Sequence, residues 1–268
     1  MRPDIADLDA FYASPCGRLA ARLIERRMAR LRPDPAGLHV LGLGYAGPFL
    51  EAFRPTAARV VALMPHEQGS ASWPADAPNR AAVVQETMLP LADRSIDVAV
   101  LVHAVEATDR VHRLLREVWR VLDDAGRLLV VVPNRRGLWC LAERTPFGQG
   151  KPYSASQLQS VLDSNLFTLL RRERALYVPP FGSPLWLRTA PMWEAAGARV
   201  ARRLSGVVMA EAEKSMIAGK PVTAEVGARA GQVVRLPARH AAARQQTTAP
   251  ADGMARHVIA LTARQRRA

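Results

Sequence analysis

Residues 38–53, with the sequence LHVLGLGYAGPFLEAF, decide which fold the rest of the chain can adopt. The apolar run at 39–43 predicts a β-strand, and the apolar residues around 49–53 predict a helix. Between them lies the glycine-rich stretch 42–47, in which glycine allows a sharp turn. A nucleotide can then approach the amide groups that open the helix. The stretch therefore predicts a strand–turn–helix unit at the ligand-binding edge of an α/β sheet.

The pattern downstream alternates apolar strands with amphipathic helices, which indicates a doubly wound, parallel sheet. We expect Asp109 to cap a helix that runs through Val121, and Asp123 to Gly126 to turn the chain after it. The further strands are predicted at 59–63, 81–84, 96–102 and 128–132.

The segments on either side of this core follow different patterns. Ser14 followed by Pro15 predicts an N-terminal helix over 14–32. Ser154 and Gln157 form a capping box that predicts a helix to about residue 163. Two more strands are predicted at 167–177 and 206–216, separated by an insertion at about 179–205 that we expect to be helical from Leu185.

Two stretches are more specific than the glycine loop. Residues 85–98, QETMLPLADRSIDV, resemble the acid, Leu-Pro and Ser-x-Asp stretch of small-molecule methyltransferases of the type 11 group. Residues 109–132 resemble the helix, turn and fifth strand of the same family. Together they identify residues 38–133 as similar to the class I S-adenosylmethionine-dependent methyltransferase family.

The resemblance implies a seven-stranded, Rossmann-like methyltransferase sheet that is mainly parallel and has an antiparallel last strand. It also implies S-adenosylmethionine as cofactor and methyl transfer to a small-molecule or lipid-like acceptor. No metal is implied. The positions that match the family's cofactor site are Gly42, Gly44, Tyr45, Gly47, Met64, Pro65, Gln85, Glu86, Thr87, Met88 and His103.

Three of these positions depart from the family pattern. Gly42, Met64 and Gln85 stand where the family usually has acids that hold the methionine end, the ribose hydroxyls and the adenine amino group. Each lost carboxylate removes charge-assisted hydrogen bonds worth about 1.5–3 kcal/mol. A second hypothesis therefore stays open, in which the chain is an inactive methyltransferase-like scaffold that binds or regulates a partner protein.

Candidate reactive residues lie at the carboxyl ends of the predicted strands, because ligands of doubly wound sheets bind there. His103 and Glu106 follow the fourth strand, and either can act as a base or serve only to stabilise the strand end. Tyr153 lies in the glycine-punctuated segment 146–154, which is either a lid over the substrate or a plain linker.

Other features leave alternatives open. Trp186 and Trp193 are seven residues apart and so share a helix face. Such a face can bind a protein partner, cover the substrate or pack in the core. The glycine loop also fits a nicotinamide cofactor. A nicotinamide site needs an acid at the end of the second strand to hold the ribose hydroxyls, and Met64 occupies that position.

Composition bounds the remaining possibilities. The net charge is +13, of which +6 lies in residues 221–268, a basic tail that we expect to be disordered after a methyltransferase-like domain at 1–220. The arginines of the tail lack interleaved aromatic residues, so nucleic acid is not an expected partner. Two widely separated cysteines and the lack of a signal peptide or transmembrane run predict a cytoplasmic protein.

Overall fold

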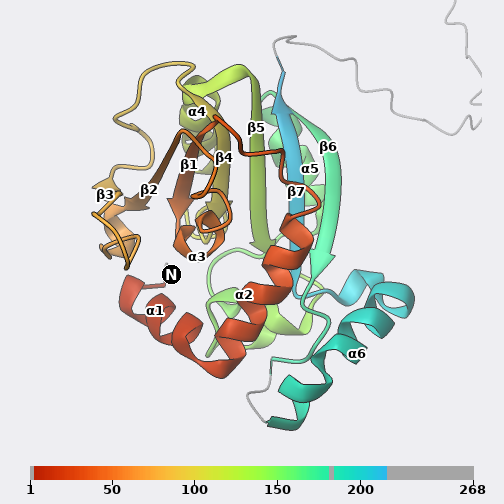
Figure 1. The fold of residues 1–268 in the computed structure, drawn as a ribbon. Helices are drawn as coiled ribbons and strands as arrows, with labels where there is room; N and C mark the ends of the chain where they lie inside the picture. Colours follow the sequence, from red (N-terminus) through yellow and green to blue (C-terminus); the bar gives the residue numbers. More distant parts are fainter. Residues whose placement is uncertain (1–2, 181–183, 216–268) are drawn as a thin grey trace, which may run out of the picture. The chain divides into compact units, whose positions relative to one another are not determined.

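The computed structural model describes residues 3–180 and 184–215, without the side chains of 184–187. These residues belong to one unit, Met1–Pro221. Seven strands form a single sheet in the order β3-β2-β1-β4-β5-β7-β6 (Figure 1). The strands are β1 (His39–Gly44), β2 (Arg59–Pro65), β3 (Ala81–Val84), β4 (Ile96–Val102), β5 (Leu122–Pro133), β6 (Phe167–Ala175) and β7 (Val207–Lys214).

The sheet is parallel from β3 through β5, and β7 runs antiparallel to both of its neighbours, β5 and β6. The mainly parallel, doubly wound sheet with an antiparallel last strand is therefore confirmed. The carboxyl ends of β1, β2 and β4 meet at one edge because parallel strands end on the same side.

Helices cover both faces of the sheet. The helices are α1 (Ile5–Ala13), α2 (Pro15–Met28), α3 (Gly47–Leu50), α4 (Val111–Val121), α5 (Ala155–Ser164) and α6 (Pro184–Val200). Short 3₁₀ turns lie at η1 (His66–Gln68), η2 (Leu138–Leu141), η3 (Pro146–Gly148) and η4 (Arg202–Leu204). Alternate strand residues divide between two cores: Val40 packs in one with α1 and α2, and Leu41 in the other with α4 and α5.

The sequence predictions were wrong at three places. The helix α1 was not predicted at all. Arg110, not Asp109, is the N-cap residue of α4. No turn separates α4 from the next strand, because Leu122 is fully buried and pairs with Ile96, so β5 begins there and runs through 123–126. The capping box of Ser154 and Gln157 is confirmed.

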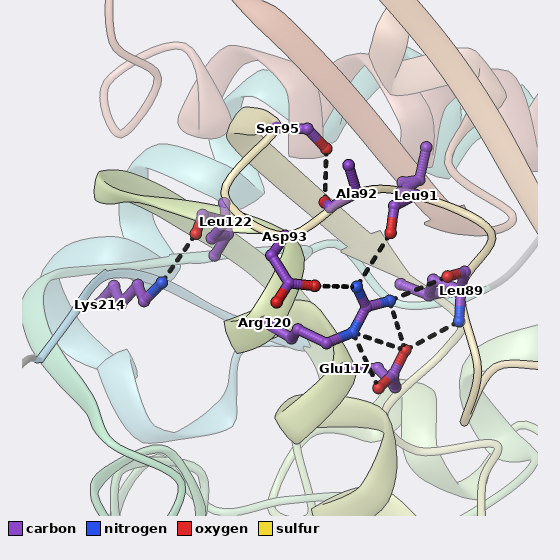
Figure 2. A network of polar contacts seen from close by, with 9 residues as sticks. All are labelled: Leu89, Leu91, Ala92, Asp93, Ser95, Glu117, Arg120, Leu122 and Lys214. Carbon is purple, nitrogen blue, oxygen red and sulfur yellow. Dashed lines mark hydrogen bonds and ion pairs between the residues drawn. The ribbon is translucent and has the colours of Figure 1, made fainter.

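Arg120 on α4 joins the two stretches that carry the family resemblance. Its guanidinium donates to the carbonyl oxygens of Leu89 and Leu91 at 2.9 Å each and to the carboxylate of Asp93 at 2.6 Å (Figure 2). Glu117, one turn earlier, bonds the same guanidinium at 2.9 Å and accepts the backbone N–H of Leu89 at 2.9 Å. The loop that follows β3 is thereby fixed to α4, which explains why the two stretches occur together.

We expect Arg120→Gln to lower the free energy of unfolding by about 2 kcal/mol, because it leaves two carbonyls and two carboxylates with fewer donors. Arg120→Lys should recover less than half of that loss, since one ammonium cannot reach acceptors that the planar guanidinium bridges. Urea unfolding followed by circular dichroism measures both. The control is Arg116→Gln, an exposed arginine of the same helix, which should change stability by less than about 0.5 kcal/mol. Equal losses in Arg116→Gln and Arg120→Gln would contradict the role assigned to Arg120.

Candidate functional site

The turn after β1 is built on a close approach to β4. Gly44 has a φ of +84°, and a Cβ there would lie 2.3 Å from the carbonyl oxygen of Val102. That same oxygen accepts the backbone N–H of Tyr45 at 2.8 Å. Only glycine combines this φ with this contact, so Gly44 fixes the turn at the carboxyl ends of β1 and β4. The expected position of residues 42–47 at the mouth of the parallel sheet is confirmed.

The other two glycines of the loop face the protein's own side chains. A Cβ on Gly42 would lie 2.5 Å from a methyl group of Leu50, so Gly42 lets α3 pack closely on β1. A Cβ on Gly47 would lie 3.0 Å from the indole of Trp73. Trp73 comes from the loop between β2 and β3, and its Nε1 donates to Glu51 at 2.9 Å.

The helix α1 covers the site. The Tyr12 hydroxyl and His103 Nε2 are 2.8 Å apart, and the Tyr12 ring stacks on Tyr45 with centroids 5.1 Å apart. The Tyr45 hydroxyl in turn donates to the carboxylate of Asp9 at 2.5 Å. Two polar contacts and one ring stack therefore hold α1 over the glycine loop and the end of β4.

The β2–β3 loop closes the site from a second side. Gln68 is fully buried and its Nε2 donates to the carbonyl of His103 at 3.5 Å. Met64, at the position where the family has the ribose-binding acid, accepts the backbone N–H of Ala71 on its sulfur at 3.3 Å. Met64 thus anchors the loop, and with Pro65 it ends β2 as predicted.

The predicted adenine-side residues divide between buried and exposed positions. Glu86 is buried and accepts a 2.5 Å hydrogen bond from the Thr108 hydroxyl. Gln85 and Met88 are exposed, and Thr87 between them is half-buried. Only Gln85 and Met88 of this group therefore present open surface to a ligand.

His103 and Glu106 form a buried pair after β4. His103 adopts a φ of +51°, and its Nδ1 lies 3.1 Å from Glu106 Oε1. Their side chains are 1% and 3% exposed. Glu106 Oε2 is buried and makes no hydrogen bond to the described part of the chain. A buried carboxylate oxygen without a donor is costly, so it indicates a place for a ligand or water.

A cavity of about 550 Å³ lies between the loop that follows β5 and the start of α5. Tyr153 lines it, together with Arg135, Lys151 and Gln157. The loop before Tyr153 is tied to Glu106, whose carbonyl oxygen accepts the backbone N–H of Lys151 at 2.8 Å. Burial and then the charge of Glu106 raise the pKa of Tyr153, which keeps this phenol a hydrogen-bond donor at neutral pH. The structure thus brings Tyr153 into the same region as Glu106.

Comparison with known proteins agrees with the resemblance in the sequence. Residues 40–130 match the family model described as methyltransferase domain. The uncharacterized protein YafS of Escherichia coli (strain K12) is 36% identical over 85 residues, which cover 31% of this chain and 32% of that protein. The match therefore spans about a third of that relative's length.

Two solved structures share the fold. One is an S-adenosylmethionine-dependent methyltransferase of Thermotoga maritima, described as a possible histamine N-methyltransferase, with a TM-score of 0.54, 15% identity, and coverage of 79% of this chain and 96% of that one. The other, from Mesorhizobium loti, has a TM-score of 0.53, 16% identity, and coverage of 77% and 100%. The described residues thus share the fold of these methyltransferases, and residues 40–130 match the methyltransferase-domain family model.

The residues at the family's cofactor position do not fit a bound S-adenosylmethionine as they stand. Tyr12, Tyr45 and Trp73 are each no more than 8% exposed, and they lie against the loop that would contact the ligand. A cavity next to Met64 has a volume of about 270 Å³. That is below the roughly 300–1,000 Å³ of small-molecule sites. Entry of the cofactor requires α1 and the β2–β3 loop to move.

Sequence reasoning missed the residues that cover the site: Asp9, Tyr12, Gln68 and Trp73. A signal for α1 exists, because Asp4 caps its first turn and the buried residues Ile5, Leu8 and Tyr12 recur at helical spacing. No local signal marks Gln68 or Trp73, since their contacts are to residues distant in the chain. Among the described residues, no cluster of side chains suited to hold a metal ion is present.

The cover formed by Asp9, Tyr12, Gln68 and Trp73 should open at high pH, because it includes a buried tyrosine. Burial, with smaller contributions from Tyr45 and Glu106, raises the pKa of Tyr12 well above its ordinary value of 10.0. A raised pKa means that the folded state favours the neutral phenol, so this stability is complete below pH 10 and is lost as pH rises through the folded pKa.

Tyr12→Phe should therefore lower the free energy of unfolding by about 1 kcal/mol at pH 8. It should also make the free energy of unfolding fall less steeply as the pH rises above 10. Urea unfolding at a series of pH values from 8 to 11.5 measures both effects. Tyr177→Phe removes another tyrosine whose pKa is raised by burial, and it shows how much of the effect comes from a buried tyrosine outside the contact with His103. If Tyr12→Phe and the wild type lose stability with the same slope, Tyr12 does not hold the cover.

Proposed function

We propose that this protein transfers a methyl group from S-adenosylmethionine to a small-molecule acceptor. The observation that carries the proposal is the methyltransferase-domain match at residues 40–130, placed on a sheet whose glycine turn lies at the carboxyl ends of β1 and β4. Both solved relatives described above are S-adenosylmethionine-dependent methyltransferases. When bound, the cofactor supplies an activated methyl group on a sulfonium.

The closed arrangement makes cofactor binding depend on an equilibrium between covered and open states. In the covered state Tyr12 and Tyr45 are bonded to His103 and Asp9, so these groups are not available to a ligand. The apparent dissociation constant then equals the intrinsic one divided by the open fraction. Weak binding is expected from this competition and from the missing acid at Met64.

The acceptor is proposed to enter the cavity lined by Tyr153. Its lining combines apolar surface with polar groups, among them Lys151, which pairs with Asp109 at 2.7 Å, and serine and glutamine side chains of α5. A small molecule that has both apolar and hydrogen-bonding parts suits this lining. Glu106, whose Oε2 makes no hydrogen bond to the described residues, lies behind the loop of Tyr153 and is the candidate base.

The scaffold hypothesis is not favoured by these comparisons. Its second support was a face formed by Trp186 and Trp193, but the side chain of Trp186 lies outside the described residues. Trp193 is half-buried and packs against the hydrophobic core. A protein partner at this face stays a prediction, as does a cytoplasmic location. No helix in the described ranges has the length and apolarity to cross a membrane.

Calorimetric titration with S-adenosylhomocysteine tests the cofactor site. The double variant Asp9→Ala/Tyr12→Phe removes two hydrogen bonds of the cover, worth about 1.5 kcal/mol together, and should tighten binding about tenfold. Neither residue belongs to the predicted cofactor site. Asp7→Ala, an exposed acid of the same helix, is the matched control and should leave the affinity unchanged. If neither the wild type nor the double variant gives binding heat at millimolar ligand, the methyltransferase proposal is wrong. The hypothesis of an inactive scaffold then remains.

A methyl-transfer assay tests whether the acceptor binds in the cavity lined by Tyr153. A protein-free cell extract is incubated with cofactor carrying a labelled methyl group, and label in small molecules is measured. Tyr153→Phe should lower this transfer at least fivefold while the affinity for S-adenosylhomocysteine stays the same, because the lost hydroxyl lines only the acceptor cavity. Transfer that is unchanged in Tyr153→Phe would place the acceptor elsewhere.

A further inference from the structure

A second pocket lies on the edge strand β6, separated from β4 by β5 and β7. It encloses about 450 Å³, and its lining residues come from the end of α2, β6, the end of α6 and η4. Figure 1 shows where α2, β6 and α6 lie in the fold. Six arginines line it: Arg27, Arg30, Arg172, Arg174, Arg202 and Arg203. We call it the arginine pocket.

The negative charge in its lining is small. Glu173 is the one carboxylate among the residues that line the pocket, and its oxygens lie 3.8 Å from Arg27 and 3.7 Å from Arg30. Contacts this long between partly exposed groups contribute little. Glu194, whose charge acts on Arg27, uses its Oε1 to accept the backbone N–H groups of Tyr177 and Val178. Six guanidinium groups and one carboxylate leave the pocket with a large positive charge.

Contacts with main-chain oxygens hold parts of the pocket in place. The Arg174 guanidinium donates to the carbonyl of Arg202. The Tyr177 hydroxyl lies 3.5 Å from the same oxygen. Burial above all, and also the charges of Arg172, Arg202 and Arg203, lower the pKa of Arg174. The cluster is therefore under electrostatic repulsion that a bound anion would relieve.

We propose that the arginine pocket binds a compact anion that carries two or more phosphate groups. Guanidinium forks match phosphate oxygens in a bidentate way. The arginines that line this pocket come from the end of α2 and the turn after it, from β6 and from η4. The volume lies within the range of small-molecule sites and exceeds what a single phosphate fills. Tyr177 is the one aromatic residue in the lining, so the stacking platform of a single-strand nucleic-acid site is not built here.

Titration calorimetry of the full chain with inorganic diphosphate at constant ionic strength tests the proposal. Diphosphate should bind at least tenfold more tightly than inorganic monophosphate. The double variant Arg172→Gln/Arg202→Gln should weaken diphosphate binding at least tenfold. The matched control Arg113→Gln/Arg116→Gln changes the net charge by the same amount on exposed positions of α4 and should weaken it less than twofold. S-adenosylhomocysteine binding should not differ between the two variants.

Other outcomes would overturn the proposal. Equal weakening in the two double variants would mean that only the overall charge matters. Tighter binding of duplex DNA than of diphosphate, lost in the same pocket variant, would make this surface a nucleic-acid interface instead. If Arg172→Gln/Arg202→Gln unfolds, Arg30→Gln/Arg203→Gln replaces it, because both side chains are exposed. Unchanged diphosphate affinity in that second variant also overturns the proposal.

Discussion

The contact between the turn after β1 and the carbonyl of Val102 is the constraint on which the site depends. Gly44 reaches this carbonyl only because it has no side chain, and the bond from the Tyr45 amide to the same oxygen locks the turn there. The turn places α3, the end of β4 and the buried His103 within one region. Any residue with a Cβ at position 44 would push β1 and β4 apart and would displace the groups that follow both strands.

The same region is covered by the protein's own aromatic side chains. Tyr12, Tyr45 and Trp73 are buried at the glycine turn, and their polar atoms are satisfied by His103, Asp9 and Glu51. The buried residues Ile5, Leu8 and Tyr12 of α1 add hydrophobic packing to these hydrogen bonds. Together these contacts keep His103 and Glu106 away from water.

Arginines serve two different purposes in this molecule. Arg120 is surrounded by carbonyl and carboxylate oxygens and fixes the loop after β3 to α4. The six arginines that line the pocket on β6 have a single carboxylate among them, and two of them, Arg172 and Arg174, each donate to one carbonyl oxygen. Residue type and overall charge do not separate an arginine that fixes a loop from an arginine that lines a pocket. The two kinds differ in the number of acceptor oxygens around the guanidinium. That number depends on which segments the fold brings together.

The sequence by itself determined the sheet and the position of its ligand-binding edge. Strand period, glycine spacing and the capping box are local, so the positions of β1, β3, β4 and α5 and the turn at 42–47 could be predicted from neighbouring residues alone. Only the tertiary structure decided what faces that edge. The bonds Tyr12–His103 and Gln68–His103 join residues 91 and 35 positions apart, and the arginine pocket joins α2 to β6. Contacts at such separations depend on packing over the whole unit, which no local pattern of residues records.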